Sequence, residues 1–387
     1  MPLYSCGFNA HGQLLQAQES DVHTLTELCS TDKTETIVFA GWSETALLGG
    51  TDGRALRLQG HFTGQASLEL LEDSQERLTA GFGDHNGLLG VLSSAGKVYT
   101  IARDPSAPSQ ITLLPPGPDS PPIGHLALAD NGRVAVTFTQ APNANLTHIS
   151  EFTTLHHFHA WHRAPTSSHP AAHHMLPGRT AQLAANSATF ALLTDAGDVY
   201  TWGDPRHRSL GRSPDPQHPA NKPCAVDALA GLRVRKLASG GWVTAALSCD
   251  CALYVWGSVA SGAGSRGLDF GTPGEEVALV AVGDGDDDGD ALDVLDVAVG
   301  DGHCVVVAEG GRLFGVGENA NGELGLGPCA PGLVERWTEI ERGGMGVAAR
   351  VWCGPKGTFV QSIERTGESL QGPQETVNYG LGAKRRR

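Results

Sequence analysis

A hairpin-like pattern recurs along this chain and restricts its fold more than any other feature of the sequence. The clearest copy spans residues 183–203, where two short apolar runs, 191–193 and 199–202, flank the turn Asp195-Ala196-Gly197. Branched and aromatic residues favour strands, and glycine supplies the positive φ of a tight turn. The pattern therefore predicts a β-hairpin. Further copies lie at residues 237–257 and 297–317, degraded copies at 38–53 and 78–99, and a half copy at 351–360.

The copies recur at a near-regular interval. One anchor residue marks the start of each copy, and successive anchors lie roughly 40 to 60 residues apart, a period typical of solenoids and propellers. Seven anchors are counted when a weak one is placed in the long gap of the third copy: Gly41, Gly81, Gly124, Asn186, Gly240, Gly300 and Gly354.

The two ends of the chain carry complementary halves of one hairpin. Residues 3–7 match the second half of the pattern, and residues 358–363 match the first half. Pairing them would close a ring and remove two exposed strand edges. We therefore predict an all-β fold, a seven-bladed β-propeller closed by pairing of the N- and C-terminal strands. The propeller is expected over residues 1–365, followed by a basic tail over 366–387.

Two loop copies near opposite ends of the chain match closely. Residues 9–14 follow the first strand with Asn9, Gly12 and Leu14, and residues 319–324 repeat the order asparagine, glycine, leucine. The asparagine suits a turn that leaves the strand, and the glycine suits a left-handed conformation. We expect each leucine to pack against the neighbouring blade.

Composition narrows the function classes. The chain has 51 glycines in 387 residues and 6% aromatics, which fits many short strands and turns. A formal net charge of −15 argues against direct binding to nucleic acid or an anionic membrane. The eight cysteines form no C-x-x-C motif and are expected as free thiols in a reducing compartment.

The ends of the chain bear on its location. We recognise no signal peptide and no membrane-spanning stretch, so a cytoplasmic location is expected. The final run Lys384-Arg385-Arg386-Arg387 is either a nuclear signal, which would add the nucleus, or a solvated end.

Three insertions between the hairpins are interpreted as loops: Pro/Ser-rich residues 105–122, His-rich residues 147–175 and acidic residues 283–290. The acidic run resembles half of a calcium loop, but its twelfth position is Leu295 where a bidentate Glu is required, so a solvated loop is favoured. The eight histidines of the second insertion lack a regular ligand spacing, so a low-complexity loop is favoured over a metal site.

Catalytic motifs are not evident in the sequence. No G-x-S-x-G, H-E-x-x-H or Walker motif occurs, and the Gly-rich residues 81–87 have the wrong spacing for a dinucleotide loop. His303 starts a hairpin at a position that Thr189 and Thr244 occupy in other copies, which favours a structural role. We expect a protein that is not an enzyme and holds no cofactor or metal.

Since no catalytic motif is found, we expect the chain to act through a binding surface. Residues just after each anchor should lie together at one end of the ring, where loop aromatics flanked by charges are typical interface anchors. The tryptophans among them could equally cap the central channel. The candidate partner-binding residues are Trp42, Phe82, Asp84, Trp242, Asp301 and Lys356.

The repeat resembles that of the regulator of chromosome condensation family. The strand end Tyr200-Thr201-Trp202-Gly203, the loop at residues 319–325 and the hairpin start at residues 297–303 carry the likeness, which is strong at residues 3–15 and 184–327 and weak at 57–174. The family fold is a seven-bladed propeller, in agreement with the pattern.

Within this family, the chain looks most like the compact fungal branch described as alpha-tubulin suppressors. That likeness implies a heterodimer with a small zinc-binding electron-carrier protein. It also implies support of Elongator-dependent wobble-uridine modification of tRNA and of diphthamide formation on elongation factor two, with the Elongator complex as a further partner. The alternative implied by the family is guanine-nucleotide exchange on a Ran-like small GTPase, and a third is a ubiquitin-pathway or cytoskeletal scaffold.

Overall fold

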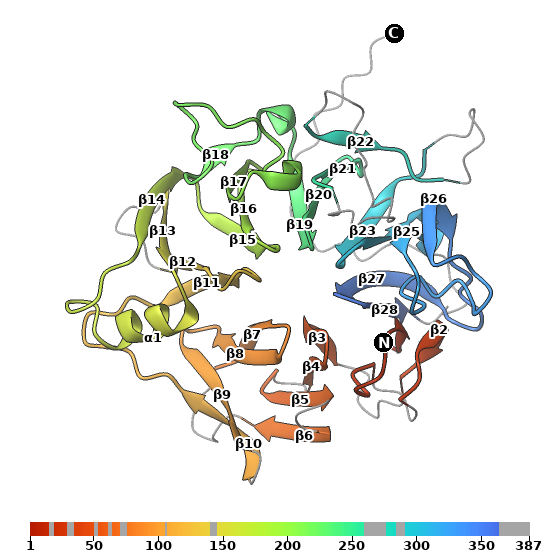
Figure 1. Ribbon diagram of the computed structural model, residues 1–387, viewed down its shortest axis with the longest axis horizontal. Coiled ribbons are helices and arrows are strands. Elements are labelled where there is room, and N and C mark those ends of the chain that lie inside the picture. Colours follow the sequence, from red (N-terminus) through yellow and green to blue (C-terminus); the bar gives the residue numbers. More distant parts are fainter. Residues whose placement is uncertain are drawn as a thin grey trace, which may run out of the picture.

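The computed structural model describes residues 1–14, 19–28, 35–49, 53–60, 64–69, 76–104, 107–139, 145–258, 276–283 and 291–363. Within these residues, seven antiparallel sheets of four strands surround a central axis (Figure 1). The predicted all-β, seven-bladed β-propeller is therefore confirmed. The basic tail over 366–387 and the acidic residues 284–290 lie outside the described residues.

Six blades are continuous segments in which the strand nearest the axis comes first. Blades 1 and 2 consist of β3 (Thr36–Ala40), β4 (Glu44–Gly49), β5 (Ala55–Gly60), β6 (Gly64–Glu69), and β7 (Leu78–Asp84), β8 (Gly87–Ser93), β9 (Val98–Asp104), β10 (Ala107–Leu113). Blades 3 and 4 consist of β11 (Ile123–Leu128), β12 (Val134–Phe138), β13 (Leu146–Phe152), β14 (Ala172–Pro177), and β15 (Thr180–Ala185), β16 (Thr189–Thr194), β17 (Val199–Gly203), β18 (Cys224–Ala225). Blades 5 and 6 consist of β19 (Val234–Gly240), β20 (Val243–Ser248), β21 (Leu253–Trp256), β22 (Ala278–Val280), and β23 (Val294–Val299), β24 (His303–Ala308), β25 (Arg312–Glu318), β26 (Leu333–Glu339).

Blade 7 joins the two ends of the chain. Its inner strands are β27 (Val347–Gly354) and β28 (Gly357–Ile363), and its outer strands are β1 (Leu3–Gly7) and β2 (Val22–Glu27). β1 pairs antiparallel with β28 in a continuous register from Leu3 opposite Gln361 to Gly7 opposite Gly357. The predicted closure is confirmed. Phe359 lies in the resulting core at 1% exposure, packed with side chains of β1 and of blade 1.

Hydrophobic side chains fill the spaces between neighbouring blades. The strand-end tryptophan Trp202 of blade 4 is fully buried, stacks on Phe190 with ring centroids 5.4 Å apart, and packs against Ala127 and Ala135 of blade 3. Trp256 of blade 5 packs in the same way against blade 4. The repeated tryptophan-glycine strand end therefore supplies a large side chain to each of these two interfaces.

The two matching loops, residues 9–14 and 319–324, have the predicted conformation. The Leu14 amide donates to the Asn9 side-chain oxygen at 2.9 Å, and the Leu324 amide donates to that of Asn319 at 3.0 Å. Gly12 and Gly322 have positive φ angles of 70° and 86°. Both leucines are buried against the next blade around the ring.

Two of the predicted loops are wrong in part: residues 114–122 and 164–171 contain no helix or strand, but the rest of each described segment is largely regular structure. Residues 107–113 form β10, the outermost strand of blade 2, and such a strand tolerates proline because it pairs on one side only. The His-rich residues 147–175 form most of β13, the helix α1 (Leu155–Arg163) and the start of β14. Thr154 caps this helix by accepting a hydrogen bond from the His157 amide at 3.1 Å.

Helix α1 is built into the interface between blades 2 and 3. Phe158 and Trp161 lie on its buried side and pack against Phe82 and Leu92 of blade 2 and Phe152 of blade 3. The described residues also contain three short 3-10 helices, η1 (Arg206–Arg208), η2 (Asp227–Leu229) and η3 (Glu309–Gly311). Among the described helices, none has both the length and the apolar character that crossing a bilayer demands.

The anchor predicted near Gly124 is also wrong. Gly124 is the second residue of β11, and the anchor of blade 3 is Ala129, whose amide donates to the Arg133 carbonyl at 3.0 Å. The corresponding bonds, in turns one residue shorter, run from the Gly41 amide to the Glu44 carbonyl at 2.8 Å and from the Asn186 amide to the Thr189 carbonyl at 3.0 Å.

Candidate functional site

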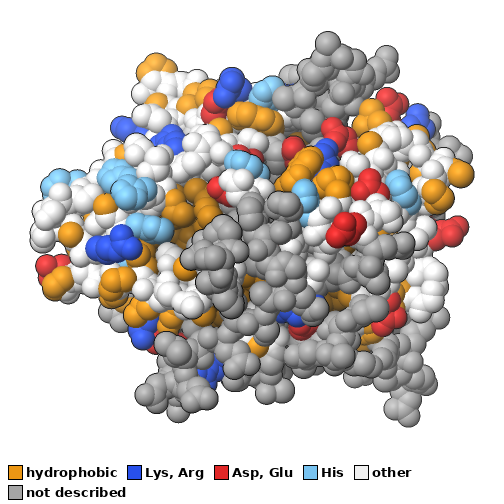
Figure 2. Space-filling model, turned by 60° about the horizontal axis from the view of Figure 1, so that its bottom comes forward, with side chains coloured by type: hydrophobic (Ala, Val, Ile, Leu, Met, Phe, Trp, Pro, Cys, Tyr) orange, Lys and Arg blue, Asp and Glu red, His pale blue; other side chains and the backbone are white. Residues whose placement is uncertain are grey.

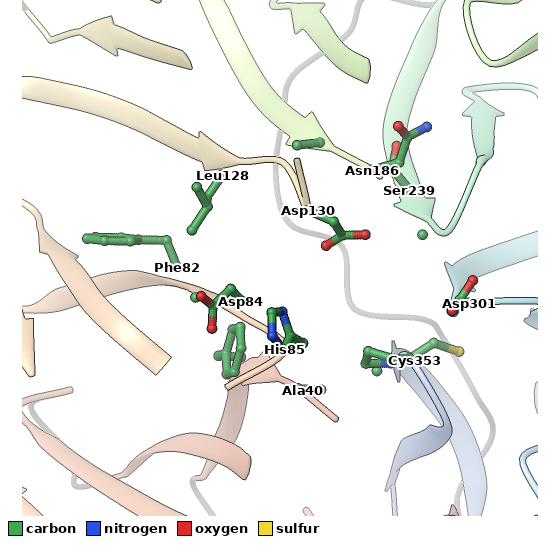
Figure 3. Close-up of a pocket in the computed structure, with 18 of the residues that line it drawn as sticks. Ala40, Phe82, Asp84, His85, Leu128, Asp130, Asn186, Ser239, Asp301 and Cys353 are labelled. Carbon is green, nitrogen blue, oxygen red and sulfur yellow. The ribbon is translucent and has the colours of Figure 1, made fainter. Parts of the chain in front are cut away.

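A cavity of about 530 Å³ opens at one end of the ring axis, and all the anchors apart from that of blade 3 line it. We call its opening the mouth; it is formed by the turns between the first and second strands of the blades. Figure 3 shows side chains from several blades around this opening. Trp42, Phe82, Asp84 and Asp301 of the predicted set contribute to its lining, while Trp242 and Lys356 do not.

Three carboxylates lie around the mouth, on turns of three different blades (Figure 3). Asp84 accepts a hydrogen bond from the Asn86 amide at 2.7 Å, and Asp130 accepts one from the Ser187 hydroxyl at 3.1 Å. No ion pair joins Asp84, Asp130 or Asp301 to an arginine or lysine of the described residues. The mouth therefore carries negative charge that the described part of the chain does not pair.

The charges at the mouth influence one another. Burial raises the pKa of Asp301, the Lys356 ammonium opposes this shift, and the Glu318 and Asp130 carboxylates add to it. Lys356 itself forms an ion pair with Glu318 and donates to the Asp301 carbonyl at 3.4 Å. The predicted binding residue Lys356 is thus engaged within the protein beside the mouth.

The two predicted tryptophans have different surroundings. Trp42 lines the cavity, is 38% exposed and packs on Phe8 with ring centroids 5.2 Å apart. Trp242 is partly covered: the His207 ring lies 4.7 Å away and the Arg206 guanidinium lies 5.3 Å from its centroid. Of the two tryptophans, Trp42 is therefore the one that lines the mouth with an exposed ring.

Phe82 has a different environment from the one predicted. It is only 5% exposed and belongs to the core between blades 2 and 3. Phe82 nevertheless contributes to the lining of the cavity, as do Asp84 and His85, which follow it in the chain. Residues that sequence reasoning missed at the mouth include His85 and Asp130. The turn-forming sequence Asp130-Asn131-Gly132 was a signal for the second of them.

His303 has the structural role that its alternation with threonine predicts. It is buried, its Nε2 atom lies 3.2 Å from the Thr358 hydroxyl of blade 7, and burial lowers its pKa to about 3. Thr189 and Thr244 likewise make local hydrogen bonds, at 2.9 Å to Ser209 and Ser239 respectively. These side chains join neighbouring strands and loops.

The histidines of the 147–175 segment gather on the side of the molecule where α1 and β14 lie (Figures 1 and 2). They have separate partners: His174 bonds to Glu151 at 2.8 Å, and His162 to Ser120 at 2.9 Å. In the described part of the chain, no three His, Cys, Asp or Glu side chains are arranged to hold a metal ion.

Comparisons with known proteins agree with this architecture. Residues 196–247 and 294–323 match models of the regulator of chromosome condensation (RCC1) repeat. The chain is 29% identical over 223 residues to mouse RCC1 domain-containing protein 1, covering 48% of this chain and 56% of that protein. It is 29% identical over 192 residues to the human probable E3 ubiquitin-protein ligase HERC6, covering 48% of this chain and 17% of that protein. These matches support the presence of RCC1-type repeats in this chain.

Solved structures show the same fold. Prp20p from Saccharomyces cerevisiae has a TM-score of 0.65 at 15% identity, covering 94% of this chain and 91% of that one. Human WBSCR16 has a TM-score of 0.64 at 14% identity, covering 94% and 99%. The chain spans a little over half the length of RCC1 domain-containing protein 1 and much less of HERC6. The class defined by fold and repeats is an RCC1-like propeller, consistent with a protein-interaction scaffold.

Proposed function

We propose that this propeller is a non-catalytic platform that binds another protein at the mouth. The observation that carries the proposal is Trp42, which is 38% exposed and lines the same cavity as three carboxylates that have no ion-pair partner among the described residues. Large aromatic side chains on rigid supports are the usual anchors of protein interfaces, and the surrounding charge selects the partner. The complementary surface would combine an apolar pocket for the indole with basic side chains for the carboxylates.

The partner we propose is the small zinc-binding electron-carrier protein that the family resemblance implies. The platform would hold this protein as a heterodimer and shape access to its metal. Through it the pair would support Elongator-dependent tRNA modification and diphthamide formation. The support for this identity is the likeness to the alpha-tubulin suppressor branch, and the support for the binding surface is the mouth itself.

Affinity purification from the native cell, followed by mass spectrometry, tests the identity of the partner. Recovery of a small zinc protein supports the proposal. Recovery of a nucleotide-free small GTPase, with accelerated nucleotide release by the purified chain, would favour the exchange-factor alternative, in which the charged and aromatic turns of the mouth contact the GTPase.

Substitution of Trp42 tests the surface. Removing an interface anchor costs about 2 kcal/mol or more, so Trp42→Ala should weaken partner binding by about 30-fold in titration calorimetry. Met175→Ala is the matched control, because Met175 is 61% exposed on the outermost strand of blade 3. Wild-type affinity of a folded Trp42→Ala variant would place the interface elsewhere.

A further inference from the structure

Three blades share one turn between their second and third strands, at the end of the ring opposite the mouth. In blade 2 the Gly96 amide donates to the Ser93 carbonyl at 2.9 Å, and in blade 4 the Gly197 amide donates to the Thr194 carbonyl at 3.0 Å. In blade 5 the Cys251 amide donates to the Ser248 carbonyl at 3.2 Å.

The outer bonds of these turns also correspond. The Ser93, Thr194 and Ser248 amides donate to the residue four positions later, at 3.0, 2.9 and 3.0 Å. The third turn residue has a positive φ in every case: 76° at Gly96, 96° at Gly197 and 63° at Cys251. These are the same tight turn, in which a residue with left-handed backbone closes the hairpin.

Blade 5 differs from the other two blades in its turn residues. Cys251 occupies the left-handed position that is glycine in blades 2 and 4, although a side chain is disfavoured there. Cys249, two residues earlier, stands where the other turns have Ser94 and Asp195. Cys249 is exposed and Cys251 is partly buried.

The turn holds these two cysteines close together. Consecutive Cα atoms are about 3.8 Å apart, so two residues flanking Asp250 in a closed turn fall within the separation of about 4.4–6.8 Å that a disulfide spans. Cys249 is exposed and so is accessible to a small oxidant, while Cys251, two residues later, is partly buried. An attacking and a resolving cysteine have this arrangement.

We propose that Cys249 and Cys251 form a redox-active dithiol that is oxidised reversibly by a small disulfide such as glutathione disulfide. The Cys249 thiolate attacks one sulfur of glutathione disulfide, forms a mixed disulfide and releases one glutathione thiolate. The Cys251 thiolate then attacks the Cys249 sulfur, closes the Cys249–Cys251 bond and releases the second glutathione. The two thiols lose two protons and two electrons, and one glutathione disulfide becomes two glutathione molecules.

Other cysteines of the chain serve as internal references. Cys6 and Cys304 are buried, and burial raises the pKa of both thiols, so they should stay reduced. Cys329 is exposed with no cysteine two residues away, so it should stop at the mixed disulfide.

The test equilibrates the full chain in glutathione buffers of increasing oxidised fraction, alkylates the remaining thiols, and maps the peptides by mass spectrometry. We expect the wild-type turn peptide to lose two hydrogens and carry no glutathione, while Cys329 carries one glutathione. Cys251→Ser and Cys251→Gly should both leave glutathione on Cys249. The glycine variant keeps the test valid if serine impairs folding, since glycine is the residue of the equivalent turns.

Oxidation is expected to be reversed by excess reduced glutathione. The proposal is overturned if the wild-type turn keeps glutathione on Cys249, or keeps both thiols free, under conditions that modify Cys329. It is also overturned if Cys249→Ser leaves the rate of Cys251 oxidation unchanged, because Cys249 would then not be the attacking thiol.

Discussion

One buried carboxyl group allows a sharp test of how the repeated loops stabilise the ring. In the first loop copy, the Gln13 side-chain nitrogen donates to the Phe8 carbonyl at 2.8 Å and to the Trp42 carbonyl of the next blade at 3.0 Å. Its oxygen accepts from the His11 amide at 3.0 Å. In the second copy, Glu323 stands at the same position and its Oε2 atom accepts from the Asn321 amide at 2.8 Å.

The other carboxylate oxygen of Glu323, Oε1, does not reproduce the hydrogen bonds of the Gln13 nitrogen. This atom is buried and lacks a hydrogen-bond partner among the described residues. It corresponds to the donating nitrogen of Gln13, which an ionised carboxylate cannot replace. Leaving a buried polar atom unsatisfied costs about 1–3 kcal/mol, so we expect Glu323→Gln to raise the free energy of unfolding by about that amount at neutral pH.

The pH dependence follows from the pKa. Burial raises the pKa of Glu323 above its usual value in the folded protein. The protonated acid can donate a hydrogen bond, so its stabilising contribution is complete below the unfolded-state pKa and is lost as the pH rises through the folded-state pKa. The advantage of glutamine should therefore be largest at neutral pH and smaller near pH 4.5, the reference pKa of this carboxyl group.

Urea unfolding followed by circular dichroism measures both effects as shifts of the midpoint. The reverse substitution Gln13→Glu is the matched control, because it introduces the same carboxyl group into the other loop and should destabilise the protein at neutral pH. An unchanged or lower midpoint for Glu323→Gln, together with a neutral Gln13→Glu, would refute the equivalence of the two loops.

Three further predictions concern the closure and the helix. Phe359→Ala should lower the free energy of unfolding by about 3–5 kcal/mol, because Phe359 is 1% exposed in the core where the two chain ends meet. The control Leu279→Ala, at a position that is 67% exposed, should leave the urea midpoint unchanged. Gly7→Ala should lower the melting temperature measured by calorimetry, since φ is 118° and a Cβ atom would lie 2.4 Å from the Lys356 carbonyl oxygen. Burial, with the Arg163 charge adding to it, lowers the pKa of His159 and His162 to about 4, so the free energy of unfolding should decrease as the pH falls from 6.5 toward 4. In urea titrations, His162→Gln should lose less stability over that range than the wild type does. An equal loss would contradict the assignment.

The repeat pattern allowed the ring and its closure to be predicted because each hairpin copy reports a buried strand pair directly. The anchor glycines have a specific physical cause. A Cβ atom at Gly240 would lie 2.5 Å from the Val299 carbonyl oxygen of the next blade, and one at Gly300 would lie 2.6 Å from the Gly354 carbonyl oxygen. Glycine marks the anchor where neighbouring blades approach this closely, and Ala129 and Asn186 show that it is not required at every blade.

Blade 3 and α1 could not be predicted by the same pattern. The interface of blades 2 and 3 is filled by Phe158 and Trp161, which come from a helix inserted between strands. Because the segment is rich in histidine, we interpreted it as a low-complexity loop. Its helix signals, an N-cap residue and two aromatic residues three positions apart, were therefore overlooked. The position of Asp130 at the mouth likewise depends on the correct register of β11, which the misplaced anchor obscured.

Hydrogen bonds to neighbouring loops hold turns of the mouth in place. Two of the turns are hydrogen-bonded to the loop that follows β1: the Phe8 amide donates to the Lys356 carbonyl at 2.8 Å, and the Gln13 side chain donates to the Trp42 carbonyl at 3.0 Å. A partner that docks on Trp42 would therefore pay little to order these turns, since their geometry exists before binding. If so, Trp42→Ala should act chiefly on the dissociation rate, while added salt should slow association by screening the mouth carboxylates. Stopped-flow measurements of the two rates would separate these effects, and a salt-independent association rate would show that the carboxylates of the mouth do not steer the partner.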